Sequence, residues 1–148
     1  MAGFAIKTNA KIIGKRFNKR SVEIAKVRIA HKKAIILLDS WVQRNFEAEG
    51  TLHEGGNNSW PALKPSTLKA RRKKGAGGKK LQDEGNLKRD WDLVDSNKEG
   101  SLKSGHGYSR VHEKGTKNVP KRKIFPTIKQ GKKIVLPAYN DFINKAIK

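Results

Sequence analysis

The stretch WPALKPSTLKARRKKGAGGKKLQDEGNL, residues 60–87, decides how the rest of the chain is organised. It opens with a Trp-Pro turn, enters a short basic helix at Ser66 or Thr67, and passes through a loop of lysine and glycine. Its apolar residues are few, so they must anchor the stretch onto the segments before and after it. None of its residues resembles a reaction centre, and the pattern is typical of a docking or assembly surface.

The composition suits a single domain with a modest core, because apolar residues make up 35 % and charged residues 32 % of the 148-residue chain. The net charge of +21 predicts an anionic partner, either nucleic acid or an acidic protein surface. Residues 34–38 form the longest wholly apolar run, far shorter than the roughly 18 residues of a membrane span, so no membrane partner is expected. The chain has no cysteine, which excludes disulfides and thiolate metal sites and fits a cytosolic protein. The N-terminus lacks the apolar core of a secretion signal.

The first half of the chain predicts an arm followed by a scaffold helix. Residues 1–20 mix apolar and basic side chains without a regular period, and we expect a flexible basic arm there, with a short edge strand or helix as the alternative. From Ser21, which can serve as an N-cap, apolar residues recur at steps of three and four, and Gly50 ends the pattern. This predicts a long amphipathic helix over residues 21–49, the scaffold of one domain that spans residues 21–148.

The segment 69–80 carries seven cations and no acid. Pro65 fits the first turn of a helix, and the cations lie on that helix and on the glycine-rich loop after it. One interpretation is a solvated, flexible loop; the other is a surface that meets phosphates or acidic side chains in an assembly. A phosphate-binding loop is rejected, because the spacing lacks the G-x-x-x-x-G-K-[ST] pattern. This basic patch comprises Lys69, Arg71, Arg72, Lys73, Lys74, Lys79 and Lys80.

After the basic patch the pattern predicts a hairpin. Residues 81–94 would form a helical turn that breaks at Gly85 and then a strand, because polar and apolar residues alternate around Trp91. Residues 101–105 would form the second strand and close the hairpin.

The last third of the chain predicts two helices separated by an extended segment. A short helix would end at Gly115, and residues 119–126 would be extended between two prolines. The apolar run 134–136 suggests a strand, after which a C-terminal amphipathic helix would begin near Pro137.

Two groups of side chains occur in catalytic or metal sites elsewhere, and each has a structural interpretation here. His53 and Glu54 are an isolated pair in a polar loop, where such residues are usually solvated. His112 with Tyr108, or with His106, would offer an acid–base pair, but no activated nucleophile or oxyanion element accompanies them. We therefore predict no catalytic residue, no metal site and no cofactor.

Four short fragments follow one another in order. They are W-x-x-L-x-x-x-T-L at Trp60, Leu63, Thr67 and Leu68; L-x-x-x-G-x-L at Leu81, Gly85 and Leu87; Y-x-x-x-H-x-x-G at Tyr108, His112 and Gly115; and P-x-R at Pro120 and Arg122. Together they resemble the phage virion-morphogenesis, or tail-completion, family, which includes the Mu-type G proteins. The resemblance covers about residues 22–147. The chain departs from the family at Glu84, where Thr is frequent, at Ser109, where Ala is frequent, and at Lys123, where a second proline is usual.

The resemblance implies a non-enzymatic structural protein that acts late in virion assembly, at the joint between a DNA-filled head and a tail. It implies a compact α+β fold, with helices packed on a small antiparallel sheet, and often a ring-like homo-oligomer. The implied partners are head–tail connector and tail proteins, in the virion and, during assembly, in the host cytoplasm. The basic arm and loop would settle against neighbouring proteins or face the packaged DNA.

The residues of the four fragments form the expected assembly surface. Trp60 and Leu63 would fix the stretch to the domain, and Tyr108 and His112 would orient the segment that follows them. Arg122 would make a bidentate contact with a carboxylate of a neighbouring subunit. The full set is Trp60, Leu63, Thr67, Gly85, Tyr108, His112, Gly115, Pro120 and Arg122.

Two other classes of protein are weighed against this interpretation. A basic nucleic-acid-binding protein of ribosomal or chromatin type is the alternative, and it rests on the charge and the three tryptophans. The sequence lacks zinc-ligand spacing, RNP and KH signatures and a clear helix-turn-helix, which argues against that class. A small nuclease is the third, but the four histidines are scattered and the carboxylates are poorly grouped.

Overall fold

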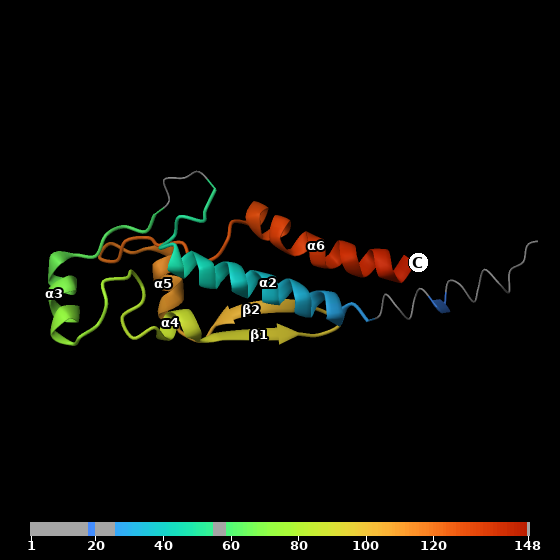
Figure 1. Cartoon of the computed structure of the whole chain (residues 1–148), viewed down its shortest axis with the longest axis horizontal. Helices are drawn as coiled ribbons and strands as arrows, with labels where there is room; N and C mark the ends of the chain where they lie inside the picture. Colours follow the sequence, from blue (N-terminus) through green and yellow to red (C-terminus); the bar gives the residue numbers. More distant parts are fainter. Residues whose placement is uncertain (1–17, 20–25, 55–58, 148) are drawn as a thin grey trace, which may run out of the picture.

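The apolar stripe in the first half of the chain forms α2 (Arg28–Glu47), and the other elements are arranged around it in the computed structural model (Figure 1). The structure describes residues 18–19, 26–54 and 59–147. After α2 come α3 (Pro65–Lys73), α4 (Asn86–Arg89), β1 (Trp91–Asp95), β2 (Gly100–Ser104), α5 (Tyr108–Lys114) and α6 (Ile128–Ile147). The fold is α+β, with helices packed on a small two-stranded antiparallel sheet, as predicted.

Two neighbours pack along α2. α6 lies along one side of it, and the β1–β2 hairpin lies along another (Figure 1). His31 of α2 contacts both: its ring meets the ring of Tyr139 in α6 edge-on at 5.8 Å, and its Nδ1 lies 2.6 Å from the carbonyl oxygen of Ser96 in the hairpin turn. Arg28 and Asp95 form an ion pair of 2.8 Å on the hairpin side. α2 is therefore the element that holds the layers together.

The hairpin depends on α2 for its stability. The two strands pair from Trp91 opposite Ser104 to Asp95 opposite Gly100, and the described residues add no third strand. A two-stranded sheet is marginal in water on its own. Gly100 lets the hairpin approach closely, because a Cβ at this position would lie 3.0 Å from the Cβ of His31.

The hydrophobic core lies where the C-terminal half of α2 meets the hairpin and the stretch 60–87. Phe46 contacts Trp60 edge-to-face at 5.3 Å between ring centroids, and Trp91 contacts Phe125 in the same way at 5.2 Å. The stretch 60–87 is thus anchored at both ends by its few apolar side chains, as predicted. The buried residues of the core are Trp41, Val42, Phe46, Trp60, Leu81, Leu87, Trp91 and Ile124.

The prediction of a strand at residues 134–136 is wrong, because these residues and Pro137 lie inside α6. The start of α6 is set by a reciprocal capping box. The backbone nitrogen of Gln130 donates to Thr127 Oγ1 over 3.2 Å, and Gln130 Oε1 accepts from the backbone nitrogen of Thr127 over 3.2 Å. Gln130 Nε2 also donates to the carbonyl oxygen of Leu52 over 2.9 Å, which ties the start of α6 to the loop after α2.

The glycines predicted to end the long helix and α5 do so, whereas the helical turn predicted before Gly85 is wrong, because α4 follows this glycine. Gly50 follows the end of α2 with φ of +92°, Gly85 precedes α4 with φ of +77°, and Gly115 follows α5 with φ of +75°. The hairpin strands and α5 begin and end within a residue or two of their predicted limits, and residues 119–126 contain no helix or strand. The predicted N-cap Ser21 and nearly all of the predicted N-terminal arm lie outside the described residues.

Candidate functional site

A hollow of about 950 Å³ lies where α3, the turn before α4, α5 and the loop after α5 meet. These parts gather at the end of the molecule opposite the C-terminus of α6 (Figure 1). Segments that are far apart in the sequence therefore share one concave surface. The lining residues are Pro61, Ala62, Leu63, Lys64, Thr67, Arg71, Leu81, Asp83, Glu84, Gly85, Asn86, Leu87, Tyr108, His112, Thr116, Lys117, Asn118, Val119, Pro120 and Arg122.

The hollow brings together most of the predicted assembly residues. Trp60 and Gly115 do not line it: Trp60 is only 2 % exposed and belongs to the core, and Gly115 forms the turn after α5. Of the predicted basic patch, Arg71 alone is in the lining. The predicted assembly residues that line the hollow are Leu63, Thr67, Gly85, Tyr108, His112, Pro120 and Arg122.

A single carbonyl oxygen fixes the segment behind the hollow. Trp60 Nε1 donates to the carbonyl oxygen of Lys123 over 2.8 Å, and Asn45 Nδ2 donates to it over 3.1 Å. His53 Nε2 lies 3.0 Å from the same oxygen. His53 is buried, so the expectation that it is a solvated loop residue is wrong. Three buried polar side chains therefore meet at one backbone atom, which holds the chain beside Arg122 in one position.

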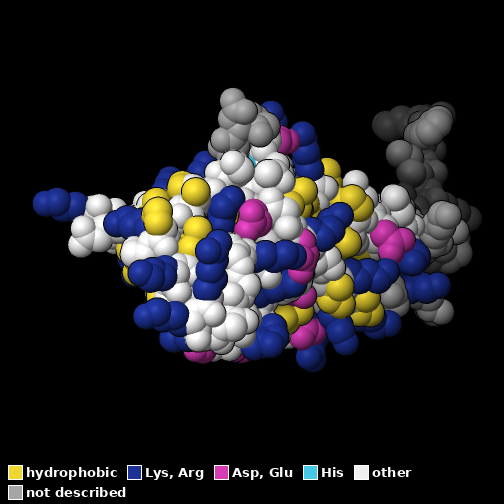
Figure 2. Space-filling view, turned by 60° about the vertical axis from the view of Figure 1, so that its left-hand side comes forward, with side chains coloured by type: hydrophobic (Ala, Val, Ile, Leu, Met, Phe, Trp, Pro, Cys, Tyr) yellow, Lys and Arg dark blue, Asp and Glu magenta, His cyan; other side chains and the backbone are white. Residues whose placement is uncertain are grey.

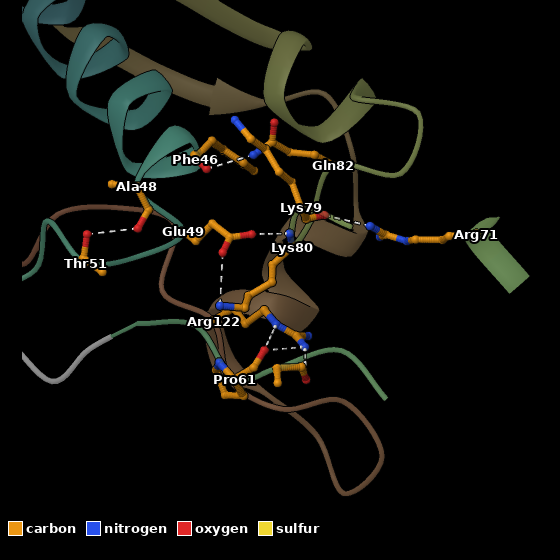
Figure 3. A network of polar contacts seen from close by, with 11 residues as sticks. Phe46, Ala48, Glu49, Thr51, Pro61, Arg71, Lys79, Lys80, Gln82 and Arg122 are labelled. Carbon is orange, nitrogen blue, oxygen red and sulfur yellow. Dashed lines mark hydrogen bonds and ion pairs between the residues drawn. The ribbon is translucent and has the colours of Figure 1, made fainter. Parts of the chain in front are cut away.

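Arg122 directs its guanidinium at its own chain (Figure 3). It is 5 % exposed, its Nη2 and Nε donate to the carbonyl oxygen of Pro61 over 3.1 and 3.4 Å, and its backbone nitrogen donates to the carbonyl oxygen of His112 over 2.7 Å. These donors tie residue 61 to α5, which differs from the outward contact with a neighbouring subunit expected from the sequence. Burial, together with the charge of Arg71, lowers the pKa of Arg122.

Arg71 organises the first part of the basic patch. Its side chain is nearly buried, and Nη1 donates to the carbonyl oxygen of Lys79 over 2.7 Å (Figure 3). Its Nε lies 3.4 Å from Asp83 Oδ1. The glycine-rich loop is thereby folded back onto α3. Since α3 extends to Lys73, the first half of the predicted flexible segment 69–80 is helical.

Ion pairs with α2 and the turn after it fasten the end of the basic patch. The backbone nitrogen of Lys80 donates to Glu49 Oε1 over 2.7 Å, and its Nζ lies 3.2 Å from Glu49 Oε2 (Figure 3). Lys79 Nζ lies 2.7 Å from Glu47 Oε2, and Lys88 pairs with the other oxygen of Glu47. The hydrogen bonds from Lys79 and Lys88 lower the pKa of Glu47 to about 2. The loop is therefore attached at its far end, which differs from the expected free loop.

Tyr108 and His112 form an aromatic wall on α5. Their rings meet edge-on at 6.4 Å, and the ring of Tyr108 stacks on that of His106 at 4.9 Å. Burial raises the pKa of Tyr108, whereas burial and the charge of Arg122 lower the pKa of His112. His112 Nδ1 is buried and has no hydrogen-bond partner among the described residues. Both side chains are therefore uncharged at neutral pH.

Besides Lys79, which pairs with Glu47, four cations of the predicted basic patch are exposed at this end of the molecule. Figure 2, which turns this end forward, shows Lys and Arg side chains over much of the surface, with fewer acidic ones and with apolar side chains between them. Within the described ranges, none of the four makes an ion pair. They are Lys69, Arg72, Lys73 and Lys74.

Two residues that build the site were not predicted from the sequence. Glu113 Oε2 accepts from the backbone nitrogens of Ile124 and Phe125 over 2.6 and 3.2 Å. The order of side chains does not show which backbone N–H groups a carboxylate will bind. Asn45 does have a signal, since it is a polar residue on the apolar face of α2. No group of three or more His, Asp or Glu side chains in residues 26–54 and 59–147 is placed to hold a metal ion.

The chain matches no family model, no curated protein and no solved structure. Of the helices in the described ranges, none combines the length and the apolar character needed to cross a bilayer. The hollow and the contacts that form it are therefore the basis for a functional assignment.

Proposed function

We propose that this chain is a non-enzymatic phage assembly protein that completes the tail at the joint between head and tail. The observation that carries the proposal is that residues of the resemblance from three separate segments meet at one hollow. Leu63 and Thr67 come from the stretch around α3, Tyr108 from α5, and Arg122 from the extended segment after α5. Residues that serve a common purpose are expected to meet in space, and these residues do.

The contacts around the hollow favour docking over chemistry. The guanidinium of Arg122 is held by the carbonyl oxygen of Pro61, and the segment after it is held by Trp60 and Glu113. A wall that its own chain fixes in this way is preformed. A preformed surface loses less conformational entropy when it binds a partner protein.

Apolar side chains on the outer faces of two helices support contacts with further proteins. Ile29 and Ile36 are exposed one heptad apart on α2, and Leu136 and Ile143 are exposed one heptad apart on α6. Rows of exposed large apolar side chains favour protein–protein contact. In the proposed particle, neighbouring copies of this chain in a ring, head–tail connector proteins and tail proteins would cover them.

The test is to interrupt the gene for this chain in the phage genome that carries it and to inspect the lysate by electron microscopy. We expect DNA-filled heads and unattached tails, few infectious particles, and recovery of both joining and infectivity when a plasmid supplies the chain. Complete, infectious particles from the interrupted gene would refute the proposal. In wild-type lysates the protein should be part of the particles and should sediment with intact virions.

The exposed cations of α3 favour a second candidate function, nucleic-acid binding, with packaged DNA as one ligand. Purified, nuclease-treated protein would be titrated with duplex and single-stranded DNA at about 50 mM and about 200 mM salt. Six to ten generic phosphate contacts lose about three to five decades of affinity over that range. Loss of this size would mean that the charge attracts any polyanion and would leave the assembly function standing. Tight binding that survives the higher salt and prefers one nucleic acid would make the second candidate the function.

A further inference from the structure

We propose that the hollow receives an acidic segment of a partner protein, one of whose carboxylates meets the guanidinium groups of Arg122 and Arg71. The inference rests on the proposed function only for the identity of the partner as a head or tail protein. The chemistry of the occupant is argued from the hollow itself.

Arg122 is a buried cation without an anion. Its guanidinium is bonded to the carbonyl oxygens of Pro61 and Ala62, and among the described residues no carboxylate lies within ion-pair distance of it. Neutral carbonyl groups satisfy hydrogen bonds but do not balance a buried charge. A carboxylate that enters the hollow would supply the missing charge.

A second guanidinium increases the positive charge of the same hollow. Arg71 is also nearly buried, and its one acidic neighbour, Asp83, is 3.4 Å away and half exposed. The two arginines repel each other, which together with burial lowers the pKa of Arg122. Planar guanidinium groups bind carboxylates with two parallel hydrogen bonds, so this pair is suited to that anion.

Two exposed lysines extend the positive charge to the rim. Lys64 and Lys117 line the hollow, and neither makes an ion pair in the part of the chain that the structure describes. With the two arginines they give four cations in the lining against two acids, Asp83 and Glu84, which leaves a net charge of +2. The charge therefore continues from the floor of the hollow to its edge.

The remaining walls are apolar and aromatic. Leu63, Val119 and Pro120 line the hollow beside the exposed ring of Tyr108, which stacks on His106. These surfaces suit an extended peptide in which acidic side chains alternate with apolar ones.

Charge argues against two occupants from this chain itself. The chain's own residues 1–17 contain four cations and no acid, so a cationic hollow would repel them. A second copy of the chain has a net charge of +21 and offers few acidic segments. The apolar walls favour a peptide over the phosphates of a nucleic acid. The test below distinguishes these two kinds of ligand.

The test is fluorescence anisotropy with the full chain and a labelled peptide of about ten residues in which Asp and Leu alternate. The matched peptide has Asn in place of Asp, and unlabelled oligothymidylate of about the same length is the competitor. At about 150 mM salt, charges outside the hollow are screened beyond about 8 Å. The rim variant is Lys64→Gln with Lys117→Gln, and its control is Lys69→Gln with Lys73→Gln, which removes the same charge from the exposed face of α3.

We expect the rim variant and the Asn peptide each to weaken binding about tenfold or more, and the control variant to weaken it less than about twofold. Thr67→Trp, which places a large ring in the hollow and keeps every charge, should abolish binding, whereas the neighbouring Ser66→Trp should not. Equal losses in the rim and control variants, or unchanged binding by Thr67→Trp, would overturn the proposal. Tighter binding of oligothymidylate that Thr67→Trp blocks would also overturn it, in favour of nucleic acid. If only the proposal about the hollow were wrong, head–tail joining would still depend on the gene. The two experiments therefore distinguish failure of this proposal from failure of the proposed function.

Discussion

The contact between Gly50 and Trp60 provides a sharp test of how the site is built. Gly50 has φ of +92°, and a Cβ added there would lie 2.6 Å from Trp60 Nε1 and 2.8 Å from Trp60 Cγ. The indole cannot retreat freely, because its Nε1 donates to the carbonyl oxygen of Lys123 and its ring packs on Phe46. Gly50→Ala should therefore strain the backbone and push Trp60 from its place behind the hollow.

The expected loss has two parts. An alanine held at positive φ costs about 1 to 2 kcal/mol. Overpacking against a fixed aromatic ring adds about 1 to 3 kcal/mol, so Gly50→Ala should destabilise the fold by about 2 to 5 kcal/mol. Gly75→Ala is the matched control, because Gly75 has φ of +70° but no atom within 4 Å of an added Cβ. It should lose only the backbone part, about 1 to 2 kcal/mol.

Thermal unfolding followed by circular dichroism measures both variants. At about 2 to 4 °C per kcal/mol, the melting temperature should fall by about 4 to 20 °C for Gly50→Ala and by about 2 to 8 °C for Gly75→Ala. Gly50→Ala should lower the melting temperature less in a Trp60→Leu background than in the wild type, because the smaller side chain removes the clash. Equal melting temperatures for the two alanine variants would show that Trp60 does not press on Gly50 and would refute the reasoning.

Three further predictions address the other contacts of the site. Glu113→Ala leaves the backbone nitrogens of Ile124 and Phe125 without an acceptor, and urea unfolding should show a loss of about 1 to 3 kcal/mol; no change would mean that water replaces the carboxylate. Arg71→Gln removes the bond to the Lys79 carbonyl, so trypsin should cut the loop after α3 faster while the helical signal stays constant; unchanged cleavage would contradict this role. Glu47 has its pKa lowered from 4.5 to about 2, so its ion pairs stabilise the folded state above about pH 4.5 and are lost as the pH falls towards 2. The difference in urea midpoint between wild type and Glu47→Gln should shrink over that range at low salt, and a constant difference would exclude these ion pairs.

Much of the fold could be predicted because its signals are local. The three- and four-residue spacing of apolar residues gave α2, and the alternation around Trp91 gave β1. Glycines mark the ends of α2 and α5 because glycine adopts positive φ at lower cost than other residues, although Glu49 beside Gly50 also has positive φ. In each case the signal and the structure it specifies lie within a few residues of each other.

The start of α6 was missed although a local signal exists. The run Ile134, Val135 and Leu136 favours a strand by composition, and Pro137 favours a helix start by position. The capping residues Thr127 and Gln130 outweigh both, since they satisfy backbone groups at the first turn of the helix. Packing of α6 against α2 then keeps the helix continuous past Pro137.

The candidate site was predictable only in part. The ordered fragments pointed to residues that the hollow brings together, such as Thr67 and His112. The sequence could not reveal that Arg122 turns inward or that Arg71 folds the basic loop onto α3, because both arginines bind backbone carbonyl oxygens. A carbonyl group is present at every position and leaves no trace in the order of side chains.

Because a backbone carbonyl group is present whatever the side chain, position 123 should tolerate substitution. Trp60, Asn45 and His53 all meet the carbonyl oxygen of Lys123, an atom that every amino acid contributes, and within the described ranges the Lys123 amide nitrogen makes no hydrogen bond. A proline would keep the carbonyl oxygen that all three contacts use. Substitutions at the three donor residues should then be selected against, whereas substitutions at position 123 should be tolerated. Among descendants of this gene, variation is expected to collect at position 123 and to spare positions 45, 53 and 60.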